Sequence, residues 1–142
     1  LKRKADSISA SQVAARDRVP IILTDGNRVV FDMTGLKKYA LASSEIISEE
    51  LVKSTNSNRL SGSDRFETNK IVIKEFYKNS NEFYISKGLK LKGAFAASTK
   101  AKSDPVVIVE SGSNKRFLSS ADKLTVFGGI NQNVRKQSIK QS

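Results

Sequence analysis

The apolar residues of this chain occur in short runs, and turn-forming residues separate the runs. Val106 to Val109 is among the longest of them, and it has the length of a β-strand. A membrane-spanning helix needs roughly 18–20 apolar residues in succession, so we expect none. Asp25-Gly26 lies between the apolar runs 19–24 and 28–32 and is a strong hairpin signal. The pattern predicts an α+β fold with a mostly antiparallel sheet of about five to seven strands, or alternatively an all-β sandwich or small barrel.

Other segments complete this prediction. Residues 88–96 alternate in polarity, with Lys90 and Lys92 on one face, as a strand would. One or two helices are expected within 35–53, because Thr34 can cap a single helix and Ser44 can start a second. Residues 54–65 are polar turn formers, which predicts a loop that is either mobile or a contact surface. The remaining expected strands are 70–77, 82–86, 105–110, 116–118 and 124–127.

The length of 142 residues fits one ordinary domain with tails. Both ends are basic and poor in large apolar side chains, so they bury too little surface to offset their ordering entropy. We therefore expect a flexible basic N-terminal arm at 1–18, a single globular domain at 19–129 and a basic C-terminal tail at 130–142.

The net charge of +11 lies in three segments: 1–18 carries +3, 78–103 carries +5 and 129–142 carries +3. Concentrated positive charge attracts polyanions. The alternative is that the lysines keep a sheet soluble and prevent its edge from pairing. The predicted polyanion contacts are Lys87, Lys90, Lys92, Lys100, Lys102, Lys115 and Arg116, and the predicted assembly arms carry Lys2, Arg3, Lys4, Arg16, Arg18, Arg135, Lys136 and Lys140.

The chain has no His and no Cys, which removes the usual triads, thiol nucleophiles and imidazole or thiolate metal sites. The remaining candidates are weak: Ser43 with Lys37 or Lys38 as a dyad, Asp25 with Asp32 as cation ligands, and the set Asp64, Glu67 and Lys70. Residues 111–116 follow an apolar strand but lack the Walker ending, so a hairpin turn explains them better than a phosphate loop. We expect neither an enzyme nor a metal nor a cofactor.

These features predict a non-enzymatic structural component of a large assembly that contains or contacts nucleic acid, such as a head, decoration or neck-tail protein of a virus or phage particle. The alternative is a stand-alone, sequence-nonspecific nucleic-acid-binding domain that uses residues 78–103. The expected partners are copies of the chain, other assembly subunits, and DNA or RNA, with no membrane and no small-molecule ligand. No apolar run follows Lys2-Arg3-Lys4, so we expect no signal peptide and a location in the virion or the cytoplasm.

Overall fold

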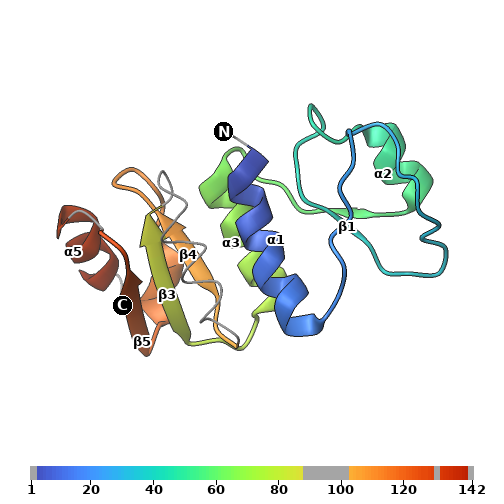
Figure 1. Cartoon of the computed structure of the whole chain (residues 1–142). Helices are drawn as coiled ribbons and strands as arrows, with labels where there is room; N and C mark the ends of the chain where they lie inside the picture. Colours follow the sequence, from blue (N-terminus) through green and yellow to red (C-terminus); the bar gives the residue numbers. More distant parts are fainter. Residues whose placement is uncertain (1–2, 88–102, 130–131, 141–142) are drawn as a thin grey trace.

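The computed structural model describes residues 3–87, 103–129 and 132–140. A three-stranded sheet lies beside a pair of packed helices, α1 and α3, and a smaller unit with β1, β2 and α2 lies beyond them (Figure 1). The elements are α1 (Arg3–Asp17), β1 (Tyr39–Ala40), α2 (Glu49–Thr55), β2 (Asn58–Arg59), α3 (Arg65–Phe76), β3 (Glu82–Lys87), β4 (Val106–Val109), the 3-10 helix η1 (Arg116–Ser120), β5 (Lys123–Phe127) and α5 (Gln132–Lys140).

Every strand pair among the described residues is parallel. The larger sheet has the order β4-β3-β5, with Tyr84 opposite Val106 on one side and Thr125 on the other. The smaller sheet pairs β1 with β2, also in parallel. All four residues of β4 are buried, as in a parallel strand covered on both faces. The predicted antiparallel sheet and the all-β alternative are therefore wrong. Parallel neighbours need a long connection, and 88–105 separates β3 from its neighbour β4 in the sequence.

The predicted strand at 70–77 is also wrong, because these residues lie in or next to helix α3. The carboxylate of Asp64 caps this helix and accepts hydrogen bonds from the backbone N–H groups of Phe66 (2.8 Å) and Glu67 (2.9 Å). The buried residues Thr68, Asn69, Val72 and Ile73 recur at the spacing of one helix face. The expected strands 82–86, 105–110 and 124–127 are confirmed as β3, β4 and β5, whereas 116–118 lies in the 3-10 helix.

The prediction of a hairpin at 19–32 is correct for the turn and wrong for the two strands, which do not form. The Asp25 carboxylate accepts hydrogen bonds from the N–H groups of Asn27 (2.9 Å) and Arg28 (3.1 Å), which fixes the turn. Gly26, at φ 100°, then docks on the segment before α2, since its carbonyl accepts the N–H of Ser48 at 2.8 Å. The turn is thus held by α2 rather than by two paired strands.

The helix expected within 35–53 is shorter than predicted and begins further along the chain. Helix α2 spans Glu49–Thr55, and Ser48 caps it by accepting the N–H of Leu51 at 3.1 Å. Residues 39–40 form β1 instead of helix. The expected strand at 88–96 lies outside the described residues.

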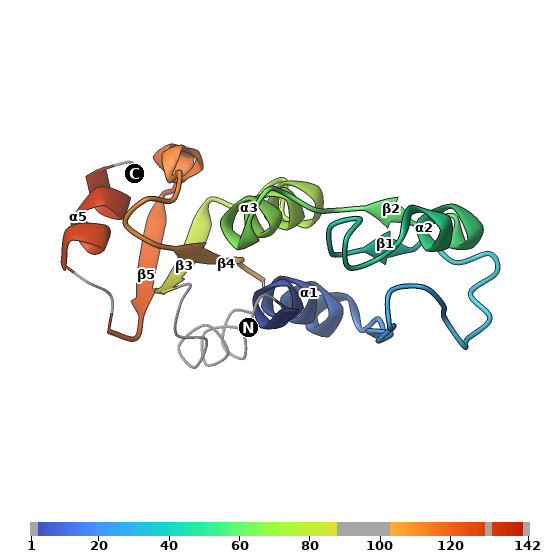
Figure 2. The ribbon, with the colours of Figure 1, turned by 90° about the horizontal axis from the view of Figure 1, so that it is seen from above.

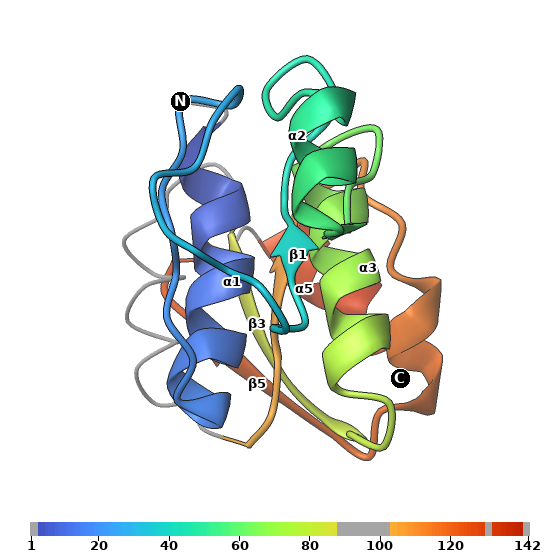
Figure 3. The same ribbon diagram turned by 90° about the vertical axis from the view of Figure 1, so that its right-hand side faces the viewer.

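Helix α1 occupies the segment expected to be a flexible arm. Ile8 and Val13 are buried, and α1 and α3 lie side by side along the free edge of β4 (Figures 2 and 3). The side chain of Gln12 accepts the N–H of Val106 at 2.7 Å, and that of Asn69 accepts the N–H of Ile108 at 3.0 Å and donates to the carbonyl of Val106 at 3.1 Å. These helices therefore satisfy backbone groups that an edge strand would leave unpaired. The division into 1–18, 19–129 and 130–142 stays a prediction.

The core lies between the larger sheet and the helices. Its buried residues come from α1, α3 and its C-cap, β3, β4, η1 and α5: Val13, Val72, Ile73, Tyr77, Phe83, Ile85, Val107, Val109, Leu118 and Val134. No helix in the described part of the chain is long and apolar enough to cross a membrane.

Candidate functional site

The predicted basic residues are spread over the molecule. Arg135, Lys136 and Lys140 are exposed on α5, at the end of the molecule opposite to α2 (Figure 1). Arg16 binds Asp17 and the carbonyl of Phe76, and its guanidinium lies 4.4 Å from the ring centre of Tyr77. Arg18 is exposed after α1, and Arg116 is exposed at the start of η1. Arg3 and Lys4 belong to α1 and Lys87 ends β3. Lys2, Lys90, Lys92, Lys100 and Lys102 lie outside the described residues.

Lys115 is buried, whereas the neighbouring Arg116 is exposed. Its ammonium group donates to the carbonyl oxygens of Glu110 (2.5 Å), Ser113 (3.0 Å) and Ser111 (3.4 Å). Burial lowers the pKa of this amine, and the nearby Glu110 carboxylate opposes the shift. The ammonium group is therefore engaged within the loop that joins β4 to η1.

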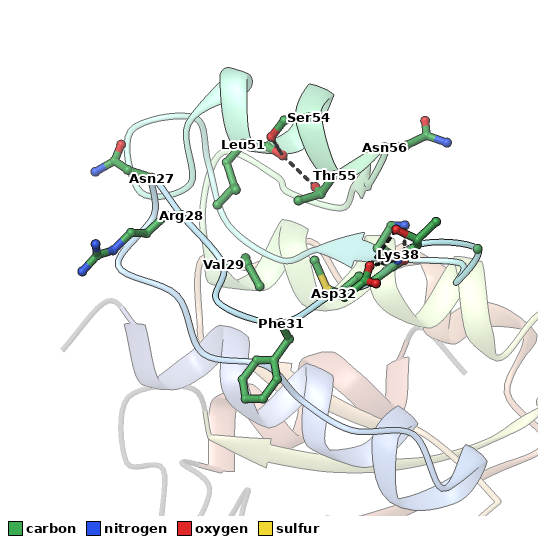
Figure 4. A pocket seen from close by; sticks show the side chains of 13 residues that line it. Asn27, Arg28, Val29, Phe31, Asp32, Lys38, Leu51, Ser54, Thr55 and Asn56 are labelled. Atoms are coloured by element: carbon green, nitrogen blue, oxygen red, sulfur yellow. Dashed lines mark hydrogen bonds between the residues drawn. The ribbon is translucent and has the colours of Figure 1, made fainter.

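A groove of about 560 Å³ lies between the segment 27–38 and helix α2. Figure 4 shows Leu51 and Thr55 reaching into it from α2 and Val29 facing them, while Arg28, Phe31 and Asn56 point outward at its rim. The ring of Phe31 points away from α2, and the residue is 67% exposed. The complete lining is Asn27, Arg28, Val29, Phe31, Asp32, Met33, Thr34, Gly35, Lys38, Leu51, Ser54, Thr55 and Asn56.

Local hydrogen bonds fix the shape of this groove. The Asp32 carboxylate accepts the hydroxyl (2.6 Å) and the N–H (2.9 Å) of Thr34, and Lys38 donates to the carbonyl of Met33 at 2.8 Å. The hydrogen bonds from Thr34 lower the pKa of Asp32, the one from the hydroxyl most strongly, and Lys38 adds to the shift. Asp32 is therefore a charged acceptor at neutral pH.

The opposite wall is also anchored. Arg59, in β2, donates to the carbonyls of Ala42 (2.5 Å) and Ile47 (2.7 Å) and forms an ion pair with Glu49 at 3.0 Å. This side chain ties the start of α2 to the small sheet. Because Gly26 binds Ser48 at the same place, the two walls are held together before any ligand arrives.

A second hollow, of about 400 Å³, lies between the start of α3 and the loop after β4, and Asp64, Glu67 and Glu110 line it. Asp64 caps α3, and Glu67 forms an ion pair with Lys70 at 2.8 Å. Asp25 and Asp32 are each engaged by their own turns. Within the described residues, no group of three or more acidic side chains could hold a metal ion.

The groove was not identified from the sequence. It combines residues 27–38 with residues 51–56, which only the docking of Gly26 on the α2 segment brings together. The available signal was a turn-rich segment that contains an aromatic residue, Phe31, next to Arg28 and Asp32. The prediction of a loop at 54–65 is wrong in part, because α2 runs to Thr55 and Asn58–Arg59 form β2; Ser54, Thr55 and Asn56 line the groove.

Comparison with known proteins gives a consistent result. Residues 59–135 match the family described as cell wall binding domain 2. Among solved structures, Cwp8 from Clostridium difficile superposes with a TM-score of 0.82 at 19% identity, covering 99% of this chain and 28% of Cwp8. Cwp6 from the same organism gives a TM-score of 0.73 at 24% identity, covering 88% of this chain and 24% of Cwp6. The chain thus spans about a quarter of each solved relative, and no curated protein matches it significantly.

These findings correct the expectations about function. The virus or phage particle component, the stand-alone nucleic-acid-binding domain, the DNA, RNA and assembly-subunit partners, and the virion or cytoplasmic location are all wrong, because the matched family binds the cell wall. The physical reason is that positive charge specifies the sign of a partner and not its chemical class. The family match extends over more than half of the sequence and includes α3, all of the larger sheet and the start of α5. This chain belongs to the cell wall binding domain 2 family.

Proposed function

We propose that this chain is a non-catalytic module that attaches a protein to the cell surface by binding an acidic polysaccharide of the cell wall. The observation that carries the proposal is the family match over residues 59–135. The net charge of +11 supports an acidic rather than a neutral polymer, because a strongly basic protein concentrates near polyanions.

The absence of catalytic groups supports binding without turnover. The sequence offers no His and no Cys, and several of the remaining Lys and carboxylate candidates have structural explanations. Asp64 caps a helix, Glu67 pairs with Lys70, and Lys115 binds loop carbonyls. A module with these features recognises a polymer and leaves it chemically unchanged.

Co-sedimentation with purified cell walls tests the proposal. Walls of Clostridium difficile are compared before and after acid treatment that strips the polysaccharide from the peptidoglycan. We expect the chain to sediment with the untreated walls only, and to be released as salt is raised, because salt screens attraction between exposed charges. Equal sedimentation with stripped walls, or none with untreated walls at about 50 mM salt, would contradict the proposal.

A further inference from the structure

We propose that residues 20–24 are a docking surface for a parallel β-strand, and that a helix and strand equivalent to α3 and β3, located earlier in the same polypeptide, supply it. Such a strand would complete a second sheet in the part of the chain that precedes the family match at 59–135. This role goes beyond wall binding and does not require the polysaccharide.

A short sequence pattern occurs twice in the chain. Both copies begin with proline, continue with four apolar or β-branched residues and end with an acidic residue. The copies are Pro20-Ile21-Ile22-Leu23-Thr24-Asp25 and Pro105-Val106-Val107-Ile108-Val109-Glu110. The stretch 38–41, which contains β1, corresponds to 123–126 in β5, and both begin with lysine. Both correspondences have the same spacing of 85 positions (20 and 105, 38 and 123), which indicates a repeated unit.

The two copies of the pattern have different environments. In the second copy, Val106–Val109 is strand β4, which pairs in parallel with β3 and is buried along its whole length. In the first copy, Leu23 is 88% exposed, whereas its counterpart Ile108 is 2% exposed. Residues 20–23 form no backbone-to-backbone hydrogen bond with another described residue. The first copy therefore has the sequence of a buried strand but lacks a neighbouring strand.

Exposed apolar side chains are concentrated around this first copy. Among the described residues, the large apolar side chains that are exposed are Val19, Ile21, Leu23, Val30, Phe31, Leu36 and, on α5, Ile139. Exposed apolar surface gathered in one segment is typical of an interaction site. The segment after α1 lies on the side of that helix away from the larger sheet, so this sheet does not cover it (Figures 1 and 2).

The complete unit shows what occupies the corresponding position. There, β3 lies between β4 and β5 and pairs with both in parallel. Helix α3 and strand β3 come before 88–102 in the sequence, and α1, at 3–17, lies 85 positions before 88–102. The counterparts of α3 and β3 would therefore precede α1. In agreement, β1 belongs to a sheet of two strands and so has one unpaired edge among the described residues.

The order of the elements favours the same polypeptide as the donor. A second molecule of this chain could donate β3 only by removing it from the middle of its own sheet, where it is paired on both edges. The chain spans about a quarter of each solved relative, so proteins with this fold have room for a further unit. Strand addition of this kind gains affinity from main-chain hydrogen bonds.

The complete unit also predicts which amides the added strand would engage. The N–H groups of Val106 and Ile108 point away from β3, because they donate to the side chains of Gln12 and Asn69. The N–H groups of alternate residues point to opposite edges of a strand, so those of Val107 and Val109 face β3. The counterparts of Val107 and Val109 are Ile22 and Thr24.

Adding the missing segment to the chain tests the proposal. A second copy of residues 65–87 is placed directly before Arg3, in place of residues 1 and 2, which reproduces the spacing of the complete unit. Amide hydrogen exchange is then compared between the extended and the unextended chain. We expect exchange at Ile22 and Thr24 to slow by about 100-fold or more, because paired amides exchange only when the strand opens.

Two matched variants of the extended chain test whether strand pairing causes the protection. Tyr84→Pro, made in the added copy only, should leave exchange fast, because the Tyr84 N–H donates to the carbonyl of Pro105 at 3.0 Å in the complete unit and proline has no N–H. Leu23→Asp should also remove the protection, by placing a charge in the new contact. Val30→Asp is the control at a position that is equally exposed but lies outside 20–24, and it should keep the protection.

A second measurement does not depend on the folding of the extended chain. A synthetic peptide with the sequence of residues 65–87 is added to the unextended chain, and amide NMR shifts are recorded. We expect the shifts to be concentrated at 19–24 and 39–41, and to be absent with the Tyr84→Pro peptide. Circular dichroism verifies that each protein is folded.

Three outcomes would overturn the inference. Fast exchange at Ile22 and Thr24 in a folded extended chain, with no shifts caused by the peptide, would show that the segment accepts no strand. Equal protection with Tyr84→Pro in the added copy would show that the protection does not come from strand pairing. Protection in the unextended chain that increases with its concentration would show that a second molecule covers the segment. The proposed function survives each of these outcomes, because co-sedimentation with cell walls tests it separately.

Discussion

Replacing Asn69 with Leu should destabilise the fold strongly, although the two side chains have the same branching and the same number of heavy atoms. Asn69 is 2% exposed and makes three hydrogen bonds: it accepts from the N–H of Ile108 (3.0 Å) and donates to the carbonyl of Val106 (3.1 Å) and the hydroxyl of Ser9 (3.0 Å). Leucine can make none of them. The edge of β4 would then bury an unpaired N–H group and an unpaired carbonyl group.

The expected magnitude follows from those two groups. Each of the two buried and unsatisfied backbone groups costs about 1–3 kcal/mol, so the loss in free energy of unfolding should be roughly 2–6 kcal/mol. A domain is stable by only about 5–15 kcal/mol, so the variant should unfold at a clearly lower urea concentration. Urea denaturation followed by circular dichroism measures the change. Asn79→Leu, at an exposed position in the turn after α3, is the control.

The reasoning would be refuted if Asn69→Leu lost less than about 1 kcal/mol with an unchanged urea m-value. In that case the contact between α1, α3 and the edge of β4 would not stabilise the fold. Helix α1 would then be peripheral, as expected of an arm. Limited trypsin digestion provides an independent check, because cleavage at Arg16 in the folded chain would place the domain boundary after α1.

Three further results are expected. Gly26→Ala should destabilise the small unit by about 1–3 kcal/mol in thermal melts, because its φ of 100° disfavours a side chain and a Cβ there would overlap the carbonyl oxygen of Ile46. Gly112→Ala is the control and should be neutral in the same melts, because the space around Gly112 is open. Lys115→Met should cost about 1–3 kcal/mol in urea denaturation because three loop carbonyls lose their donor, whereas Arg116→Met at the exposed neighbour should change little. The pKa of Asp32 is lower in the folded than in the unfolded chain. Its contribution to stability is therefore present above the unfolded pKa of about 3.9 and is lost as the pH falls through the folded pKa. In thermal melts between pH 6 and pH 2, Asp32→Asn should lose less stability on acidification than the unchanged chain does.

The strands of the larger sheet could be predicted from the sequence, but their direction could not. The apolar runs at 82–86, 105–110 and 124–127 have strand length and clear boundaries, and all three are strands. Apolar periodicity does not encode which strands pair or in which sense. The fully buried run Val106–Val109 was the best signal of a parallel strand, since a half-exposed antiparallel strand would alternate.

The two long helices were missed for different reasons. In α3, the β-branched run Ile71-Val72-Ile73 favours a strand by propensity, and tertiary contacts override it. In α1, part of the docking contact is made by two polar side chains, Ser9 and Gln12, which meet partners on α3 and β4 far away in the sequence. A search for apolar faces detects neither contact.

For the function, the sequence predicted only the charge of the partner. The excess of basic residues indicated an acidic partner, and that part of the interpretation remains in the proposed function. The chemical class of the partner required the comparison with known families. The groove required the structure, because the segment 27–38 lies beside α2 only through the contact of Gly26 with Ser48.

Direct titration of the chain with purified wall polysaccharide tests the central claim most sharply. Isothermal titration calorimetry of the soluble polymer into the chain, repeated at several salt concentrations, measures affinity without peptidoglycan or other wall components. The account predicts saturable binding at about 50 mM salt that weakens steadily as salt is raised. The absence of binding at that salt concentration, with the chain shown to be folded, would contradict it.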